Sequence, residues 1–335
     1  MNEEQKKTLY TAFKPTGDLQ LGNYIGVLRR LVEYQNEYNC IYTVADMHSL
    51  TVDCVPADLR RRTYEFTALF LSIGLDPEKC TLFVQSHVPA HAELTWVLNC
   101  NTMMGEASRM TQFKDKGKKA GTAGINVGLF DYPVLMASDI LLYQADLVPI
   151  GKDQVQHLEL ARNIADRFNS RYSPTFTVPD ALLGSKSSAK IFNLLDPTTK
   201  MGKTDDNTEG VIFLLDSEDD IMRKFRRAVT DSGSEIRCAA DKPGISNLIG
   251  IYSAMTGKSA KAAEAEFAGK PYSEFKTAVG EAVAAHLKPV QAEYKRYISD
   301  KGELERIMKA GADKAAYIAR KTLSKVYRKV GFITI

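Results

Sequence analysis

Short apolar runs alternate with longer amphipathic stretches through the first half of the chain. Four runs predict buried strands, at residues 9–13, 40–45, 80–85 and 147–150. Stretches with apolar residues at helical spacing cover residues 24–34, 56–73 and 155–168. Strands that alternate with helices of this length are typical of parallel β-α-β units. We therefore expect an α/β fold with a doubly wound parallel sheet, in which ligands bind at the carboxyl ends of the strands.

The pattern changes near residue 210. Residues 218–330 hold long helical stretches and almost no strand-like run, which predicts a helical domain. We expect the sheet domain to span residues 1–210 and the helical domain residues 211–335. An inserted, mobile segment is expected near residues 105–128, where a basic and a glycine-rich stretch adjoin. The last predicted helix gathers the cations Arg320, Lys321, Lys325, Arg328 and Lys329.

Composition is that of an ordinary globular protein. The chain has 335 residues, is 44% hydrophobic, and carries 44 basic against 41 acidic residues, a net charge of +3. This balance neither identifies nucleic-acid binding nor excludes a local basic face. The five cysteines are widely spaced, so neither a zinc knuckle nor a disulfide framework is predicted. Without a signal-peptide core or a long apolar run, we expect a cytoplasmic protein with no membrane partner.

Glycines follow the first predicted strand in residues 15–23, Pro-Thr-Gly-Asp-Leu-Gln-Leu-Gly-Asn. Glycine lets the backbone approach a ligand closely. The helix that starts near Gly22 offers free N–H groups and a positive dipole end, which suit a phosphate. Considered alone, these glycines are explained better by a plain turn between a strand and a helix.

A basic loop lies near the end of the predicted sheet domain, at residues 200–204, Lys-Met-Gly-Lys-Thr. Its two lysines can embrace a polyphosphate as point charges, although a solvated loop explains them better when they are considered alone. The pairing of the two motifs is more specific. Together they resemble the His-Ile-Gly-His and Lys-Met-Ser-Lys-Ser signatures of class I aminoacyl-tRNA synthetases, whose catalytic domain is Rossmann-like.

Further segments narrow the resemblance to the bacterial tryptophanyl-tRNA synthetases. These segments are residues 22–26, 88–91, 110–114, 132–143, 228–232 and 243–248. The resemblance implies tryptophan–tRNA ligase activity, in which ATP activates L-tryptophan to tryptophanyl-adenylate and the amino acid passes to tRNA(Trp), releasing AMP and pyrophosphate. It implies that residues 211–335 bind the anticodon, with the basic C-terminal helices on the tRNA. It also implies a homodimer, and no DNA partner is expected.

The resemblance places a tryptophan pocket around Asp139. This carboxylate would accept the indole N–H and reject phenylalanine, which would leave the acceptor unpaired. Tyr132 and Gln154 would hold the ammonium group, and His48 falls where the family has a pocket histidine. The residues expected to wall the indole are Tyr10, Met136, Val148 and Ile150. Without the resemblance, core packing explains these apolar residues equally well.

The resemblance places ATP across the first motif, the loop after the fourth strand and the lysine loop. The implied binding residues are Lys14, Pro15, Thr16, Gly22, Asn23, Gly151, Lys152, Asp153, Ile191, Lys200, Met201, Gly202, Lys203 and Thr204. Lys114, Lys200 and Lys203 would reach the phosphates, and with Asn23 they are the expected catalytic residues. Mg²⁺ is expected on the phosphates of ATP, with no separate metal site. Catalysis would rest on positioning and charge neutralisation.

The sequence departs from the family pattern around the ATP site. Lys14 and Met47 each stand where the family usually has Gln, and Gln20 stands where it has Thr or His. Lys152 replaces a Glu, and Gly202 and Thr204 replace two serines. Two of these residues add positive charge. We therefore expect altered ATP affinity or inhibitor sensitivity rather than lost activity.

Three rival functions share parts of these patterns. A tyrosyl-tRNA synthetase has the same fold but needs polar groups for a phenol hydroxyl, and residues 132–143 and 243–246 favour tryptophan. A non-catalytic paralogue that acts as a binding module would not need Lys200 and Lys203. A nucleotidyltransferase with another acceptor would not need the helical domain.

Overall fold

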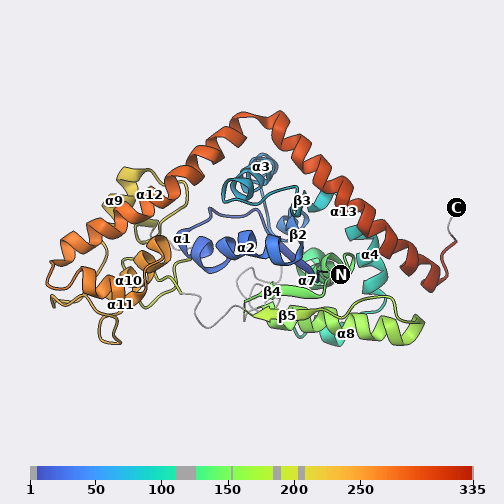
Figure 1. Ribbon diagram of the computed structural model, residues 1–335. Helices are drawn as coiled ribbons and strands as arrows, with labels where there is room; N and C mark the ends of the chain where they lie inside the picture. Colours follow the sequence, from blue (N-terminus) through green and yellow to red (C-terminus); the bar gives the residue numbers. More distant parts are fainter. Residues whose placement is uncertain (1–5, 111–125, 152–153, 184–189, 203–207, 334–335) are drawn as a thin grey trace, which may run out of the picture.

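The centre of the molecule is a five-stranded parallel sheet (Figure 1). The structure, a computed structural model, describes residues 6–110, 126–151, 154–183, 190–202 and 208–333. The strands are β1 (Thr8–Phe13), β2 (Asn39–Val44), β3 (Thr81–Val84), β4 (Leu147–Ile150) and β5 (Asp180–Leu183). Their order, β3-β2-β1-β4-β5, and their parallel pairing confirm the predicted doubly wound fold.

The four predicted strands are confirmed to within one residue at each end, but β5 was not predicted. This strand lies at the edge of the sheet and pairs only with β4. Its four residues are mostly exposed, so it lacks the apolar run that marks a buried strand. β1, β2 and β3 have such runs because their side chains are buried on both faces of the sheet.

Neighbouring residues of each strand point to opposite faces of the sheet, and each face has its own core. Leu9 and Leu82 belong to the core under α2 (Arg29–Glu37) and α3 (Pro56–Ser72). Tyr10 and Phe83, one position further along, belong to the core on the other face. The helices of that face are α4 (Ala90–Asn99), α7 (Val127–Leu141) and α8 (Val155–Tyr172).

The chain after residue 217 is helical, as predicted. Its helices are α9 (Glu218–Arg226), α10 (Pro243–Thr256), α11 (Ala260–Glu266), α12 (Tyr272–Ser299) and α13 (Lys301–Val330). Figure 1 shows α12 and α13 as two long arms that meet at the top of the molecule, with α9, α10 and α11 gathered beside α12. We call α9, α10, α11 and the adjoining part of α12 the helical lobe.

Helix α13 follows α12 and lies along β3, the edge strand opposite β5. The approach is so close that a Cβ on Gly311 would lie 1.8 Å from the carbonyl oxygen of Leu82. Ala315 and Leu323 are buried in the core that also contains α4 and α8. Helix α13 thus covers an otherwise open edge, and it packs with the sheet domain. The division at residue 211 stays a prediction.

Short helical turns follow β2 and β3 at their carboxyl ends. A 3₁₀ turn at Met47–Thr51 follows β2, another at Gln85–His87 follows β3, and α5 (Met104–Ala107) lies beyond α4. Residues 111–125, most of the predicted inserted segment, lie outside the described residues. No helix in the described part of the chain combines the length and apolar character that crossing a bilayer requires.

Candidate active site

The two central strands β1 and β4 diverge into different connections at their carboxyl ends, which is where a doubly wound sheet binds ligands. Lys14, Pro15 and Thr16 follow β1, and Gly151 follows β4. Lys14 is half-buried, with its Nζ 3.4 Å from Oγ1 of Thr51. The turn after β1 contains Gly17 at a φ of +66°, a conformation that favours glycine.

The first motif forms a capped helix start. Gln20 precedes α1 (Leu21–Asn23), and its side-chain oxygen accepts hydrogen bonds from the backbone N–H groups of Gly22 and Asn23. Asn23 Oδ1 accepts from the backbone N–H of Gln20 at 3.3 Å, which completes a capping box. The expectation of free N–H groups at this helix start is therefore wrong for this structure. The side chain of Gln20 is long enough to fold back and satisfy them.

The lysine loop belongs to a hairpin that contacts the first motif. Phe192 and Lys200 face each other in an antiparallel bridge, and the Met201 N–H donates to the Ile191 carbonyl at 3.0 Å. The Met201 carbonyl accepts a 2.8 Å hydrogen bond from Gln20 Nε2. The structure thus joins two motifs that are 181 positions apart in the sequence. Lys200 is exposed, whereas Met201 is buried.

Asp139 lies on α7 and is 1% exposed. Its Oδ1 accepts hydrogen bonds from Gln85 Nε2 at 2.7 Å and His91 Nδ1 at 2.6 Å, and its Oδ2 accepts one from His48 Nε2 at 2.8 Å. Burial raises the pKa of Asp139. The hydrogen bonds and charges of His48 and His91 together lower this pKa by more than burial raises it, so the net pKa shift is downward. The protein therefore holds an ionised carboxylate inside an apolar region.

Sequence reasoning supplied His48 but missed the other two residues that hold Asp139. Gln85 directly follows β3 and His91 lies at the start of α4, and both are about fifty positions before Asp139 in the sequence. His91 Nε2 in turn lies 2.8 Å from the Tyr143 hydroxyl. The segment 88–91 carried part of the family resemblance, and its position after a strand is the signal that could have assigned His91 a role.

Several other residues of the predicted tryptophan pocket belong to the core on the α7 face of the sheet, and α7 carries Asp139. The Tyr10 ring stacks on Tyr143 with centroids 5.6 Å apart. The Tyr132 hydroxyl is 2.7 Å from His157 Nε2, and burial raises the pKa of Tyr132 to about 12. Tyr132 also meets His48 edge to face. Predicted residues that pack in the same core are Met136, Val148 and Ile150.

The predicted ATP residues are only partly within the described structure. Gly151 follows β4, and its carbonyl accepts a 3.0 Å hydrogen bond from the backbone N–H of Gln154, the residue expected at the ammonium group of tryptophan. Ile191 is buried, and Gly202 is half-buried. The residues that lie outside the described ranges are Lys114, Lys152, Asp153, Lys203 and Thr204.

The sequence and the fold of this chain are similar to those of known tRNA synthetases. Residues 1–288 match the family of class I tRNA synthetases for tryptophan and tyrosine (W and Y). The chain is 52% identical to a tryptophan–tRNA ligase of Clostridium tetani, over 99% of this chain and 97% of the relative. The tryptophanyl-tRNA synthetase of Mycoplasma pneumoniae has a TM-score of 0.86 at 35% identity, covering 98% of this chain and 99% of that one.

A structure from Campylobacter jejuni, described as a tryptophanyl-tRNA synthetase complexed with ADP and tryptophan, has a TM-score of 0.84 at 32% identity, covering 97% of this chain and 100% of that chain. The fold, the joined motifs and these matches define a class I aminoacyl-tRNA synthetase. The chain belongs to the tryptophanyl branch of that family, and it is a tryptophan–tRNA ligase that uses ATP. The three rival functions are thereby set aside.

Proposed function

We propose that Asp139 selects tryptophan by accepting its indole N–H at Oδ2. A carboxylate offers about four acceptor positions, two on each oxygen. Oδ1 already accepts two hydrogen bonds, whereas Oδ2 accepts one from His48 among the described residues. One position on Oδ2 therefore suits an incoming N–H. This buried, ionised and incompletely saturated carboxylate is the observation that carries the proposal.

The rest of the pocket supports selection by shape and hydrogen bonding. Tyr10, Met136, Val148 and Ile150 would wall the indole, because they pack in the same core as α7, the helix that carries Asp139. Tyr132, on α7, and Gln154, which lies between β4 and α8, would orient the ammonium group. Phenylalanine would leave the Oδ2 position unpaired, which costs about 1–3 kcal/mol. A phenol hydroxyl would not place its proton where an indole N–H does.

ATP would lie across the carboxyl ends of β1 and β4. The triphosphate would extend from Lys14, Pro15 and Thr16 toward Lys200, with Gly151 beside the ribose. Lys114, Lys203, Lys152, Asp153 and Thr204 are assigned to the same site from the family resemblance alone. The tryptophan carboxylate attacks the α-phosphate, a new C–O–P bond forms, and the bond to the β-phosphate breaks to release pyrophosphate. The lysines neutralise the charge that develops on the phosphates.

Mg²⁺ would arrive with ATP. In phosphoryl-transfer sites this ion is usually bound by substrate phosphates with one or two carboxylates. Among the described residues no group of three or more His, Cys, Asp or Glu side chains is arranged to hold a metal ion. The proposal that Mg²⁺ binds through ATP rests on the phosphate chemistry of the reaction and on the family resemblance.

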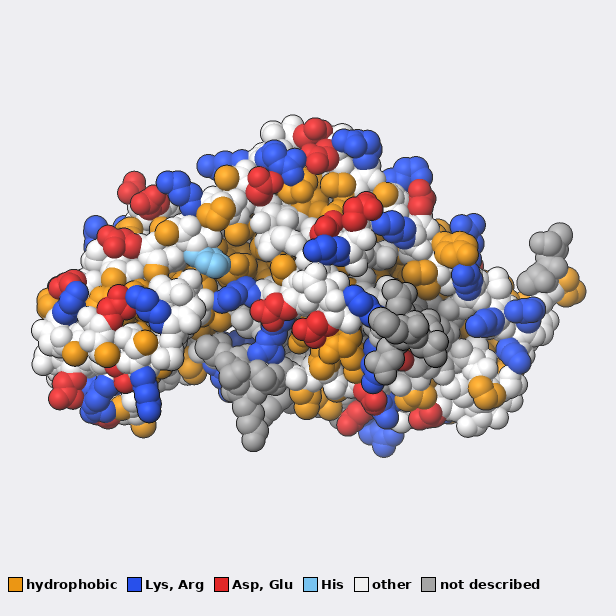
Figure 2. Space-filling view, viewed as in Figure 1, with side chains coloured by type: hydrophobic (Ala, Val, Ile, Leu, Met, Phe, Trp, Pro, Cys, Tyr) orange, Lys and Arg blue, Asp and Glu red, His pale blue; other side chains and the backbone are white. Residues whose placement is uncertain are grey.

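The exposed face of α13 is our candidate for contact with the tRNA backbone. No acidic residue follows Asp313 in the sequence, and Figure 2 shows basic side chains along α13 toward its C-terminal end. The exposed basic residues of this half are Lys314, Arg320, Lys321, Lys325, Arg328 and Lys329. They extend over roughly 22 Å at 1.5 Å per residue. Such a row suits a line of phosphates. The helical lobe would then be left to bind the anticodon.

An apolar groove near the pocket supports a homodimer. Trp96 is 68% exposed and Leu50 is 63% exposed, and both line a groove of about 320 Å³ that also includes Tyr132. The neighbouring Val127 is 80% exposed. Clustered apolar side chains of this kind mark interaction surfaces. A second copy of the chain would cover them, and the dimer would act in the cytoplasm.

The proposed role of Lys200 at the phosphates can be tested with Lys200→Ala. The matched control is Lys270→Ala, which removes a half-exposed lysine between α11 and α12 that pairs with Glu274. We expect Lys200→Ala to lower kcat of tryptophan-dependent ATP–pyrophosphate exchange about 100-fold, because it removes a fixed charge at the transition state. The KM for tryptophan should stay within about twofold of the wild-type value. Equal activity of the two variants would refute the role.

A further inference from the structure

One side chain of α10 grips the backbone of the lysine-loop hairpin. Asn247 is buried, its Oδ1 accepts from the Phe192 N–H at 2.9 Å, and its Nδ2 donates to the Phe192 carbonyl at 3.0 Å. The hairpin's own bonds join Asn193 to Thr199 and Met201 to Ile191, so they leave both backbone groups of Phe192 pointing outward. Asn247 satisfies both groups, as a neighbouring strand would.

The gripped residue lies directly opposite Lys200. Phe192 and Lys200 are partners in the antiparallel bridge, so the position of one backbone determines that of the other. The hairpin is held on its other side by Gln20, through the Met201 carbonyl. The helical lobe adds one more bond, from the Val229 N–H to the Leu194 carbonyl at 2.7 Å.

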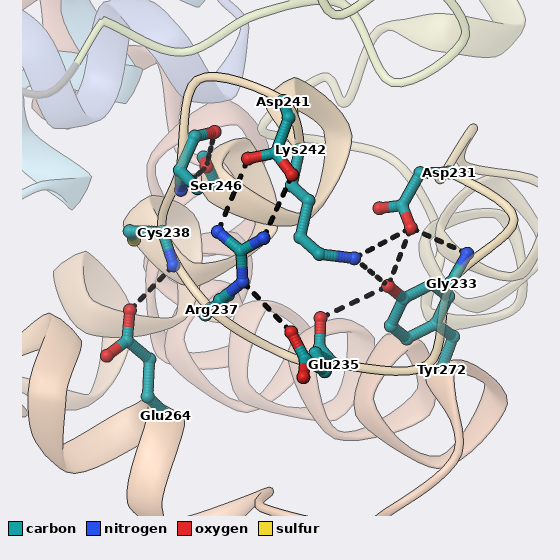
Figure 3. A network of polar contacts seen from close by, with 11 residues as sticks. Asp231, Gly233, Glu235, Arg237, Cys238, Asp241, Lys242, Ser246, Glu264 and Tyr272 are labelled. Atoms are coloured by element: carbon teal, nitrogen blue, oxygen red, sulfur yellow. Dashed lines mark hydrogen bonds and ion pairs between the residues drawn. The ribbon is translucent and has the colours of Figure 1, made fainter.

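Helix α10 is itself tied to the rest of the helical lobe at its first turn (Figure 3). Lys242, which precedes the helix, is buried and lies 2.8 Å from Asp231 Oδ1 and 2.9 Å from the Tyr272 hydroxyl. Tyr272 is the first residue of α12. A Cβ on Gly244 would lie 2.2 Å from the Val229 carbonyl oxygen, so α10 and the preceding loop are in close contact. The helix that carries Asn247 is therefore held in place within the helical lobe.

We propose that Asn247 is a positioning residue for the activation of tryptophan: it sets the placement of Lys200 relative to the triphosphate through the backbone of Phe192. This inference rests on the proposed role of Lys200. It makes the first reaction depend on a contact between the helical lobe and the ATP site. Asp139 and the residues that hold it come from other elements, α7, α4 and the segments that follow β2 and β3, and do not take part in this contact.

The test is ATP–pyrophosphate exchange by Asn247→Ala and Asn247→Asp. Alanine removes both hydrogen bonds, and aspartate keeps the acceptor for the Phe192 N–H while setting a carboxylate against the Phe192 carbonyl. We expect both variants to lower kcat/KM for ATP at least tenfold, with KM for tryptophan within twofold. Of asparagine, aspartate and alanine, only asparagine bonds both the N–H and the carbonyl of Phe192. Asn247→Asp should therefore not retain wild-type activity.

Asn169→Ala is a matched control for simple loss of stability. Asn169 also clamps a phenylalanine backbone, accepting from the Phe176 N–H at 2.9 Å and donating to the Phe176 carbonyl at 2.8 Å, but it lies at the far end of α8. Its removal should lower Tm and leave kcat/KM for ATP unchanged. Equal kinetic losses in the Asn169 and Asn247 variants would overturn the proposal, as would wild-type kinetics in both Asn247 variants.

A double variant separates this inference from the function of Lys200. If Asn247 acts by placing Lys200, then Asn247→Ala should have little further effect in a Lys200→Ala protein, because the group that it positions is gone. Additive losses would show that Asn247 acts elsewhere. A Lys200→Ala protein with wild-type exchange would instead refute the proposed role of Lys200, independently of how the Asn247 variants behave.

Discussion

Asp139→Asn is the sharpest test of how the enzyme recognises tryptophan. The substitution keeps the size of the side chain but turns one of its two oxygens into an NH₂ group. Two buried donors, Gln85 and His91, face Oδ1, so the remaining amide oxygen should take that place. The NH₂ group would then face His48 and the indole. A donor would meet the substrate N–H where the wild-type protein offers an acceptor.

The size of the effect follows from the lost hydrogen bond. A hydrogen bond to a charged group contributes about 1.5–3 kcal/mol, and each 1.4 kcal/mol corresponds to a factor of ten. We therefore expect kcat/KM for tryptophan to fall about 10- to 140-fold. The comparison substrate is β-(3-benzothienyl)alanine, in which sulfur replaces the N–H group. Its kcat/KM should change little, because it has no proton to donate to Asp139.

Tryptophan-dependent and analogue-dependent ATP–pyrophosphate exchange measure these two effects on the same protein samples. Thermal melting of both proteins checks that the substitution leaves the fold intact. The reasoning is refuted if Asp139→Asn loses activity equally with both substrates, since the loss would then come from the shape of the pocket. It is also refuted if a well-folded variant keeps the wild-type preference for tryptophan over the analogue.

Three further changes test the fold and the charges around the site. Gly311→Ala should lower stability by about 1–3 kcal/mol in a denaturant titration, because its Cβ would overlap the Leu82 carbonyl and push α13 from the sheet. Lys242 lowers the pKa of Asp231 to about 2, so this pair stabilises the fold above about pH 4 and the contribution is lost as the pH falls toward 2. The stability difference between wild type and Lys242→Met should narrow over that range and stay constant between pH 5 and 7. Lys14→Gln should raise the KM for ATP in pyrophosphate exchange only about two- to fivefold, because a partly exposed charge contributes little to binding. Added salt should weaken this effect by screening the charge.

The sheet could be predicted because its strands must be apolar on both faces. β1, β2 and β3 lie between two cores, so their runs stand out in the sequence. β5 did not stand out, because an exposed edge strand has no such requirement. The course of α13 was also not predicted, since a helical pattern shows which face is buried and not what it is buried against.

The surroundings of Asp139 could be predicted only in part. The family resemblance supplied Asp139, His48 and Tyr132, and the structure brings these three together. It did not supply Gln85 or His91, which reach Asp139 from about fifty positions away. A single polar residue after a strand carries no periodic signal, so its partner becomes visible only when the strands are placed side by side.

Two amide side chains explain why the lysine loop was the hardest part to foresee. Gln20 and Asn247 hold the two strands of the same hairpin, Gln20 at Met201 and Asn247 at Phe192. An amide suits this task because it carries a donor and an acceptor: Asn247 satisfies two backbone groups at once, and Gln20 satisfies three. Apolar patterning specifies the two cores, but it says nothing about such contacts. The placement of Lys200 therefore depends on a few long-range polar bonds, and single substitutions at these amides should change catalysis more than they change the fold.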